Sequence, residues 1–297
     1  MKTLEQYLQE KYSRRSYKVH GYMISKYLEY IGRKATTAQY KDILQFIAHL
    51  RKNENYTPES VKRYLSEVKI YYNYLLETGL RNDHPCRELY LKDKISKQIK
   101  VDRLYSEETL ENYLEKIRKD PDGKLKKRNE VIVSLLVYQA LTVAEICNLN
   151  IEDINLEKAE IYIKSGHRKK TRTLPLKACQ ILLFYHYLKE DYPELTKYLK
   201  RDSAEGSEPE KLITGRLQEE VKPNALNRMI NKGRKPEEML KPVKIRQSVI
   251  ANLLRKENDT RIVQVFAGHN RASTTIQYKQ TELEILKNAI NTFHPIQ

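Results

Sequence analysis

The sequence predicts a mainly α-helical protein with a small β-hairpin or three-stranded sheet, divided into two domains. Apolar residues recur at helical spacing along most of the chain, and only the stretch at 159–176 alternates in the manner of strands. The 297 residues suffice for two domains of ordinary size. We expect a helical domain over 1–88, a linker over 89–104 and a second domain over 105–297.

The first domain is predicted to contain four helices. Gly32 is placed to end the second helix, and Thr57 followed by Pro58 is the pattern of an N-cap and a first helical residue. The spacing of apolar side chains places the helices near residues 3–12, 14–31, 37–52 and 58–79.

The segment after the fourth helix breaks this periodicity. His84 and Pro85 end the helical block. Five basic residues then follow in a stretch with little periodicity: Lys92, Lys94, Lys97, Lys100 and Arg103. We expect this stretch to be an interdomain linker, and its charges would suit a strap across a DNA backbone.

The second domain is predicted to surround a central helix. Residues 128–140 are apolar on nearly all sides, which is typical of a buried helix. A helix opening at Ser106 precedes it, and a short helix at 142–149 follows. Alternating residues at 159–164 and 171–176 predict two strands joined by a basic tip, SGHRKK. Further helices are expected near 177–190, 223–232, 242–256, 259–267, 271–278 and 281–292, with an exposed loop at 201–210.

The charge balance points to a polyanionic partner. Lys and Arg number 55 against 39 Asp and Glu, which gives a net charge of +16 at pH 7. Proteins this basic commonly bind nucleic acid, although abundant solvated lysines would give the same composition.

Several classes of protein are excluded by the composition. No run of about 18 apolar residues exists to span a membrane, and the first residues lack the apolar stretch of a signal peptide. The three cysteines, Cys86, Cys147 and Cys179, form no CxxC pair, and the seven histidines show no HExxH spacing. We therefore expect a cytoplasmic protein without disulfides or a bound metal.

The most informative residues lie between Leu240 and Gln280. Arg246 is followed by the apolar segment SVIANLL, the segment IVQVFAGH ends at His269, and the segment STTIQY ends at Tyr278. In this order and spacing, the three segments resemble the catalytic end of the tyrosine recombinases, the phage-integrase and Xer family.

The resemblance implies a fold and a reaction. The helical block would be the N-terminal core-binding, SAM-like domain, and residues 105–297 the catalytic domain. Tyr278 would attack a DNA phosphodiester and form a 3′-phosphotyrosyl link, without a cofactor. Arg246 would grip the scissile phosphate, and His269 would hydrogen-bond a non-bridging oxygen or assist the proton transfer. The function would be site-specific DNA recombination: integration or excision of a mobile element, or DNA inversion.

The resemblance also implies partners. Double-stranded DNA would be the substrate, and the active form would be a homo-oligomer, a tetramer on DNA that exchanges its C-terminal helix between protomers. Accessory DNA-bending proteins would be further partners, with no membrane contact, and the protein would be cytoplasmic and associated with the nucleoid.

Two positions depart from the family pattern. The first catalytic Arg, in a TGLRxSE segment, is replaced by Thr142, and the His or Lys of the His-x-x-Arg segment is replaced by Val243. Thr142 and Glu145 instead form the pattern of a capping box.

The catalytic Lys of the family lies at the tip of the β-hairpin. Counting back from Arg172 places it on His167, and a small shift of register would place it on Lys169 or Arg168. One hypothesis is that Arg168 reaches the place of the missing guanidinium. The alternative is that the tip only grips phosphates of the minor groove.

Two other functions remain as alternatives. A degenerate recombinase would bind DNA without strand transfer, which the changes at Thr142 and Val243 would suit. A type IB topoisomerase would use the same tyrosine chemistry to relax DNA, but the N-terminal helical block and the C-terminal tail argue against it.

Overall fold

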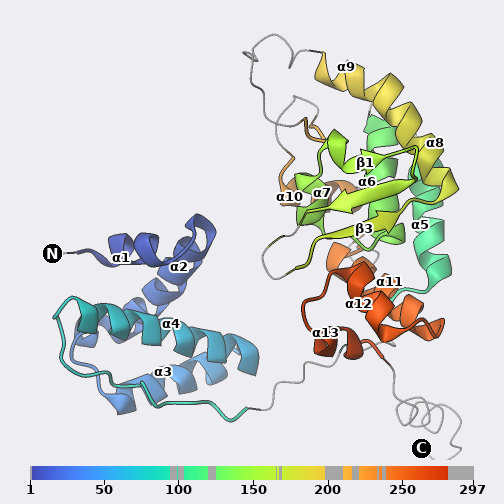
Figure 1. Ribbon diagram of the computed structural model, residues 1–297. Helices are drawn as coiled ribbons and strands as arrows, with labels where there is room; N and C mark the ends of the chain where they lie inside the picture. Colours follow the sequence, from blue (N-terminus) through green and yellow to red (C-terminus); the bar gives the residue numbers. More distant parts are fainter. Residues whose placement is uncertain are drawn as a thin grey trace, which may run out of the picture. The chain divides into compact units, whose positions relative to one another are not determined.

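The computed structural model describes residues 2–93, 99, 104–119, 125–164, 166, 169–197, 210–215, 221–232, 234–235 and 239–279. The chain divides into two compact units, Met1–Ser96 and Lys97–Gln297, which we describe separately (Figure 1).

The N-terminal unit is a helical bundle with an aromatic core. The fully buried side chains of Tyr27 and Tyr72 share a hydrogen bond between their hydroxyl groups, and Phe46 packs edge-on against Tyr27. Ile24, Ile43 and other aliphatic side chains fill the space around these rings. The elements are α1 (Leu4–Lys11), α2 (Arg14–Ile31), η1 (Gly32–Lys34), α3 (Tyr40–Lys52) and α4 (Pro58–Glu77).

Local capping signals set most of these helix ends. The Thr57 side chain accepts a hydrogen bond from the Ser60 backbone, and Pro58 is the first helical residue, as predicted. Gly32 ends α2 with a φ of 58°. Helix α3 begins later than the predicted residue 37, because Gln39 forms the N-cap and its backbone N–H donates to Asp42.

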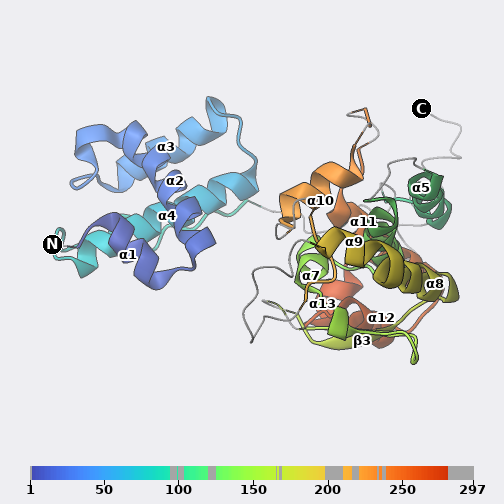
Figure 2. The same ribbon diagram turned by 90° about the horizontal axis from the view of Figure 1, so that it is seen from above.

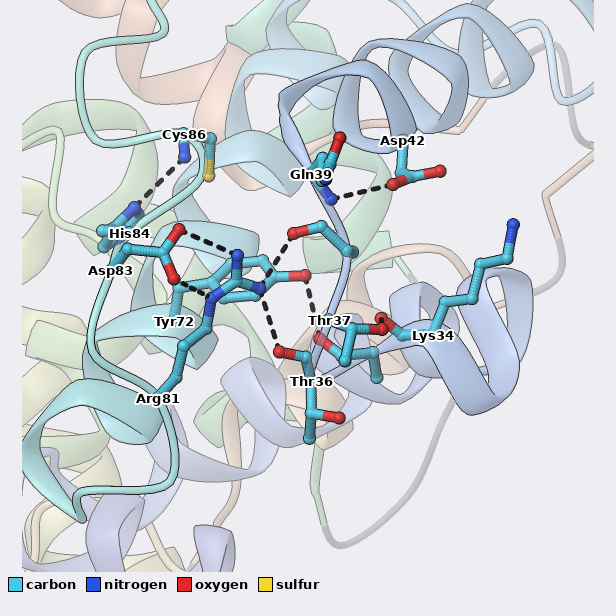
Figure 3. A network of polar contacts seen from close by, with 12 residues as sticks. Lys34, Thr36, Thr37, Gln39, Asp42, Tyr72, Arg81, Asp83, His84 and Cys86 are labelled. Carbon is cyan, nitrogen blue, oxygen red and sulfur yellow. Dashed lines mark hydrogen bonds and ion pairs between the residues drawn. The ribbon is translucent and has the colours of Figure 1, made fainter.

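Arg81 ties the end of α4 to the connection between α2 and α3 (Figure 3). Its guanidinium donates to the carbonyl oxygens of Thr36 at 3.0 Å and Ala38 at 2.8 Å. It also forms a two-pronged ion pair with Asp83, at 2.7 and 2.9 Å, and lies over the ring of Tyr72. One side chain therefore joins the end of α4 to two carbonyl oxygens of this connection.

The C-terminal unit is built around α6 (Lys126–Tyr138), as the sequence predicts. Its residues from Val131 to Val137 are buried. Helices α5 (Glu107–Lys119), α8 (Ala178–His186) and α11 (Pro242–Arg255) pack against it (Figure 1).

A three-stranded antiparallel sheet lies beside these helices. Its order is β1 (Ile154–Asn155), β2 (Glu160–Ile163) and β3 (Arg172–Pro175). Ile161 pairs with Leu174, and both side chains are buried. Strand β1 has only two residues, too few to show alternation in the sequence.

The remaining elements complete the C-terminal unit (Figure 2). The helix predicted near 177–190 continues through a π-helical turn, η5 (Tyr187–Asp191), into α9 (Tyr192–Thr196). The helix expected at 271–278 is shorter, α13 (Ala272–Ile276), so that Tyr278 lies just beyond its end. The others are α7 (Val143–Asn148), η4 (Ile151–Asp153), α10 (Pro223–Ile230) and α12 (Thr260–Ala267).

Some predicted elements fall outside the described residues. These are the helix at 281–292 and almost all of the loop at 201–210. Among the residues that are described, no helix is both long and apolar enough to cross a lipid bilayer.

Replacing Arg81 should loosen the N-terminal unit. In Arg81→Ala the carbonyls of Thr36 and Ala38 lose their charged donor, so we expect the free energy of unfolding to fall by about 2–3 kcal/mol. Urea unfolding measures the loss, and hydrogen exchange should rise first around residues 34–40. Asp83→Ala is the control, because it leaves the two carbonyl contacts in place. An equal loss in both variants would show that the ion pair, and not the carbonyl contacts, carries the stability.

Candidate active site

The N-terminus of α7 contributes a capping box to the candidate site. Thr142 is the N-cap, and its hydroxyl accepts a hydrogen bond from the Glu145 backbone and donates to Glu145 Oε2 at 2.8 Å. The Thr142 backbone N–H also donates to Oε2, at 2.7 Å. This confirms the predicted capping box and holds the buried carboxylate of Glu145 in one orientation.

Three basic side chains converge on the carboxylate of Glu145. Arg172, from β3, donates to Oε1 at 2.9 Å, and Lys169 Nζ lies 3.1 Å from Oε2. Arg246, from α11, approaches the same Oε2 at 4.0 Å. Burial alone would raise the pKa of Glu145, but the hydrogen bond and charge of Arg172, with Thr142 and Lys169, outweigh it and lower the pKa to about 2.

Arg246 is buried and oriented by backbone carbonyls. Its two terminal nitrogens donate to the carbonyl oxygens of Ala140, just before α7, and Ala267, at the end of α12. Ala140 has a φ of 50°, which turns its carbonyl out of the regular helical direction. The guanidinium of Arg246 therefore links three elements at one point.

His269 follows the left-handed end of α12. Gly268 has a φ of 65°, and the His269 backbone N–H then donates to the carbonyl of Gln264 at 3.0 Å. The imidazole Nδ1 lies 2.9 Å from the hydroxyl of the buried Thr275. Burial, with the charges of Arg246 and Lys169, lowers the pKa of His269 to about 4. The ring is therefore neutral at pH 7.

Tyr278 lies directly beside His269. The two rings stack, with centroids 6.1 Å apart and planes inclined by 16°, and Tyr278 is only 8% exposed. Burial raises the pKa of Tyr278, while the charge of Arg246 and a hydrogen bond from Gln247 act in the opposite direction. The phenol is thus protonated at pH 7, next to a guanidinium that would stabilise its anion.

The arm of the β-hairpin is attached to the His269 turn through the backbone. Lys169 and His269 form an isolated antiparallel bridge, and the Lys170 backbone N–H donates to the carbonyl of Gly268 at 3.2 Å. A Cβ atom at Gly268 would come within 2.6 Å of Arg172 Nη1. Only glycine allows the turn and the hairpin to approach this closely.

The structure brings four of the predicted site residues into one cluster: Arg246, His269, Tyr278 and Lys169. Val243, in contrast, is 68% exposed at the start of α11. His167 and Arg168 lie outside the described residues.

Arg172 and Glu145 were not predicted as site residues. Arg172 occupies the same face of β3 as the buried Leu174, so its position two residues away was a signal that a charge is buried there. Nε and Nη2 of Arg172 are buried without a hydrogen-bond partner in the described part of the chain. These two nitrogens are available to bind a ligand.

The chemistry of the cluster suits an oxyanion better than a metal ion. Within the described residues, no group of three or more His, Cys, Asp or Glu side chains is placed to hold a metal. Lys169, Arg172 and Arg246 instead outnumber the one carboxylate. A phosphate group carries the charge and the acceptors that such a cluster binds.

Two family models match the chain. The model of the phage integrase family matches residues 103–284, and the model of the phage integrase N-terminal SAM-like domain matches residues 1–82.

The curated relatives are tyrosine recombinases. The chain is 30% identical over 281 residues to the tyrosine recombinase XerA of Pyrococcus furiosus, covering 94% of this chain and 87% of the relative. It is also 30% identical over 271 residues to the tyrosine recombinase XerC of Rickettsia prowazekii, covering 88% and 81%.

Solved structures share the fold. The XerH site-specific recombinase, bound to its difH substrate before cleavage, matches with a TM-score of 0.70 and 20% identity, over 98% of this chain and 84% of the other. The Tn1549 transposon integrase, in complex with a circular intermediate DNA, matches with a TM-score of 0.65 and 13% identity, over 98% of this chain and 100% of the other.

The buried imidazole of His269 should make stability depend on pH. Its pKa, about 4 in the folded protein, lies below the value near 6.5 expected for unfolded chains. The stabilisation is therefore fully present above about pH 6.5 and is lost as the pH falls through 4. We expect the free energy of unfolding, from urea titrations, to fall over this window less steeply in His269→Gln than in the wild type. Identical slopes in the two proteins would contradict the prediction.

Adding a methyl group at Gly268 should separate the turn from the hairpin. Gly268→Ala forces a left-handed alanine and a contact with Arg172, so we expect a loss of about 1–3 kcal/mol in the free energy of unfolding. Gly166→Ala is the matched control, because nothing lies within 4 Å of a Cβ atom there. Equal stability of the two variants by thermal unfolding would show that the close approach is unimportant.

Proposed function

We propose that Tyr278 is the nucleophile of this protein, because the chain belongs to the phage integrase family and is a tyrosine-type site-specific DNA recombinase. In the proposed step, the Tyr278 oxygen loses its proton and forms a bond to a DNA phosphorus. The bond from phosphorus to the 5′ oxygen breaks, and that oxygen takes up a proton. A 5′-hydroxyl of another strand later reverses the step, so the number of phosphodiester bonds is conserved.

The other residues of the cluster have distinct roles in this proposal. Arg246 binds the scissile phosphate and stabilises the additional charge of the transition state. His269 is neutral, and Thr275 engages its Nδ1, so Nε2 is the nitrogen that faces the reaction, either as a donor to a non-bridging oxygen or in the proton transfer.

One observation carries the proposal. Tyr278 and His269 stack on each other, and Tyr278 lies close enough to Arg246 for the charge of the guanidinium to favour the phenolate. All three come from one chain, so the cluster can attack a phosphate without a residue from a second protomer.

The residues of the hairpin tip complete the proposal. His167 is the candidate for protonating the 5′ oxygen, with Arg168 and Lys169 as the alternatives that a shift of register would allow. Val243 has no polar group to bind a phosphate, so we assign it no role in the chemistry.

The wider assembly is proposed from the same family membership. Residues 1–88 and 105–297 would hold double-stranded DNA, with the basic stretch at 89–104 as the linker. A tetramer on DNA would exchange the C-terminal helix, with DNA-bending proteins as accessory partners. The biological reaction would be integration or excision of a mobile element, or inversion, in the cytoplasm at the nucleoid.

Tyr278→Phe should abolish covalent attachment and leave DNA binding nearly unchanged. The substitution removes the attacking oxygen but no charge. The substrate is a duplex that the protein selects from a randomised library, carrying a nick that traps the covalent intermediate. Gel electrophoresis under denaturing conditions measures the adduct. Tyr162→Phe, which removes an exposed hydroxyl on β2, is the control and should form adduct normally.

The same substrate separates the alternatives. Adduct followed by strand exchange supports the recombinase, adduct with relaxation alone would indicate a topoisomerase, and binding without adduct would indicate a degenerate recombinase. An adduct that persists in Tyr278→Phe would overturn the assignment of the nucleophile.

A further inference from the structure

Lys169 contacts the residue that stands at the first arginine position of the family pattern. That arginine position is Thr142, whose hydroxyl accepts a hydrogen bond from Lys169 Nζ at 3.0 Å. The Thr142 Oγ1 atom occupies the γ position of the side chain, through which an arginine at this residue would extend. The ammonium group therefore lies beside the path that the missing side chain would take.

Lys169 and Arg246 both face one oxygen atom. Glu145 Oε2 lies 3.1 Å from Lys169 Nζ and 4.0 Å from Arg246 Nη1. The two cations are therefore neighbours around one carboxylate oxygen. The side chain of Lys169 is 24% exposed, against 8% for Arg246, so Lys169 is the more accessible of the two cations.

The backbone holds Lys169 in this place. Its bridge to His269 and the hydrogen bond from Lys170 to Gly268 attach this arm of the hairpin to the turn that carries the histidine. Two of the three N–H donors of the ammonium group point to Thr142 and Glu145 in the described structure, which leaves one for a phosphate oxygen.

We propose that Lys169 replaces the first arginine of the family pattern in this protein and binds the scissile phosphate together with Arg246. In this proposal the arm of the β-hairpin, and not the start of α7, supplies the positive charge. This inference rests on the proposed function, and it assigns to Lys169 a role different from the proton donor that the hairpin lysine of the family supplies.

The competing role for Lys169 is that of the general acid. Burial lowers the pKa of Lys169, which would also suit a proton donor. The two roles respond differently to the leaving group. A phosphate-binding charge remains necessary when the bridging 5′ oxygen is replaced by sulfur, whereas a general acid becomes dispensable, because a thiolate leaves without a proton.

The experiment combines substitutions at two positions with two DNA substrates. Lys169→Gln should reduce the rate of adduct formation on the selected nicked duplex by about 10²–10³-fold, since a transition-state charge contact is lost. The double variant Thr142→Arg, Lys169→Gln should form adduct at least about tenfold faster than Lys169→Gln alone, because the guanidinium returns to its position in the family pattern. A 5′-bridging sulfur should not restore the rate of Lys169→Gln.

Lys158→Gln is the matched control. Lys158 lies in the turn between β1 and β2, outside the cluster, and is exposed, so the rate of this variant should stay within about threefold of the wild type. Lys169→Arg, which keeps the charge, should retain more activity than Lys169→Gln. Circular dichroism melting of each variant separates a loss of chemistry from a loss of fold.

Three outcomes would overturn the inference. They are a wild-type rate in Lys169→Gln, full rescue by sulfur, and no rescue by Thr142→Arg in a folded double variant. Failure of the proposed function is distinguishable, because the wild type would then form no adduct or Tyr278→Phe would still form one.

Discussion

The buried carboxylate of Glu145 is the group on which the rest of the site depends. Lys169 and Arg172 come from the arm of the β-hairpin and Arg246 from α11, and without an anion between them their charges would repel one another in a poorly solvated place. The carboxylate is itself oriented by the capping box at the start of α7. A local signal for beginning a helix therefore also gathers the cations of the site.

Local signals account for most of what the sequence predicts correctly. Thr57 and Pro58 begin α4, Gly32 ends α2, and Thr142 caps α7, each through contacts within a few residues. The grouping of Arg246, His269 and Tyr278 is what the resemblance to the tyrosine recombinases implies. These features need only the neighbouring backbone or a known pattern, and so they are visible in a single sequence.

Contacts between distant segments account for the rest. The sequence leaves open which hairpin residue lies near Arg246, because this depends on how the hairpin arm pairs with the turn at Gly268. The sequence does not identify Arg172 as a site residue, because its burial beneath that turn is a tertiary contact. Strand β1 is likewise defined by its pairing with β2 and not by a pattern of its own.

The attachment of the hairpin arm to the His269 turn has a consequence for cooperativity. It consists of a single short backbone bridge, whereas Arg246 is held by two carbonyls within the packed helices. Local opening of the hairpin arm would therefore withdraw Lys169 and Arg172 together from Glu145, while Arg246 stays fixed in the packed helices. The competence of the site would then depend on a sub-global equilibrium, separate from the stability of the unit that contains it.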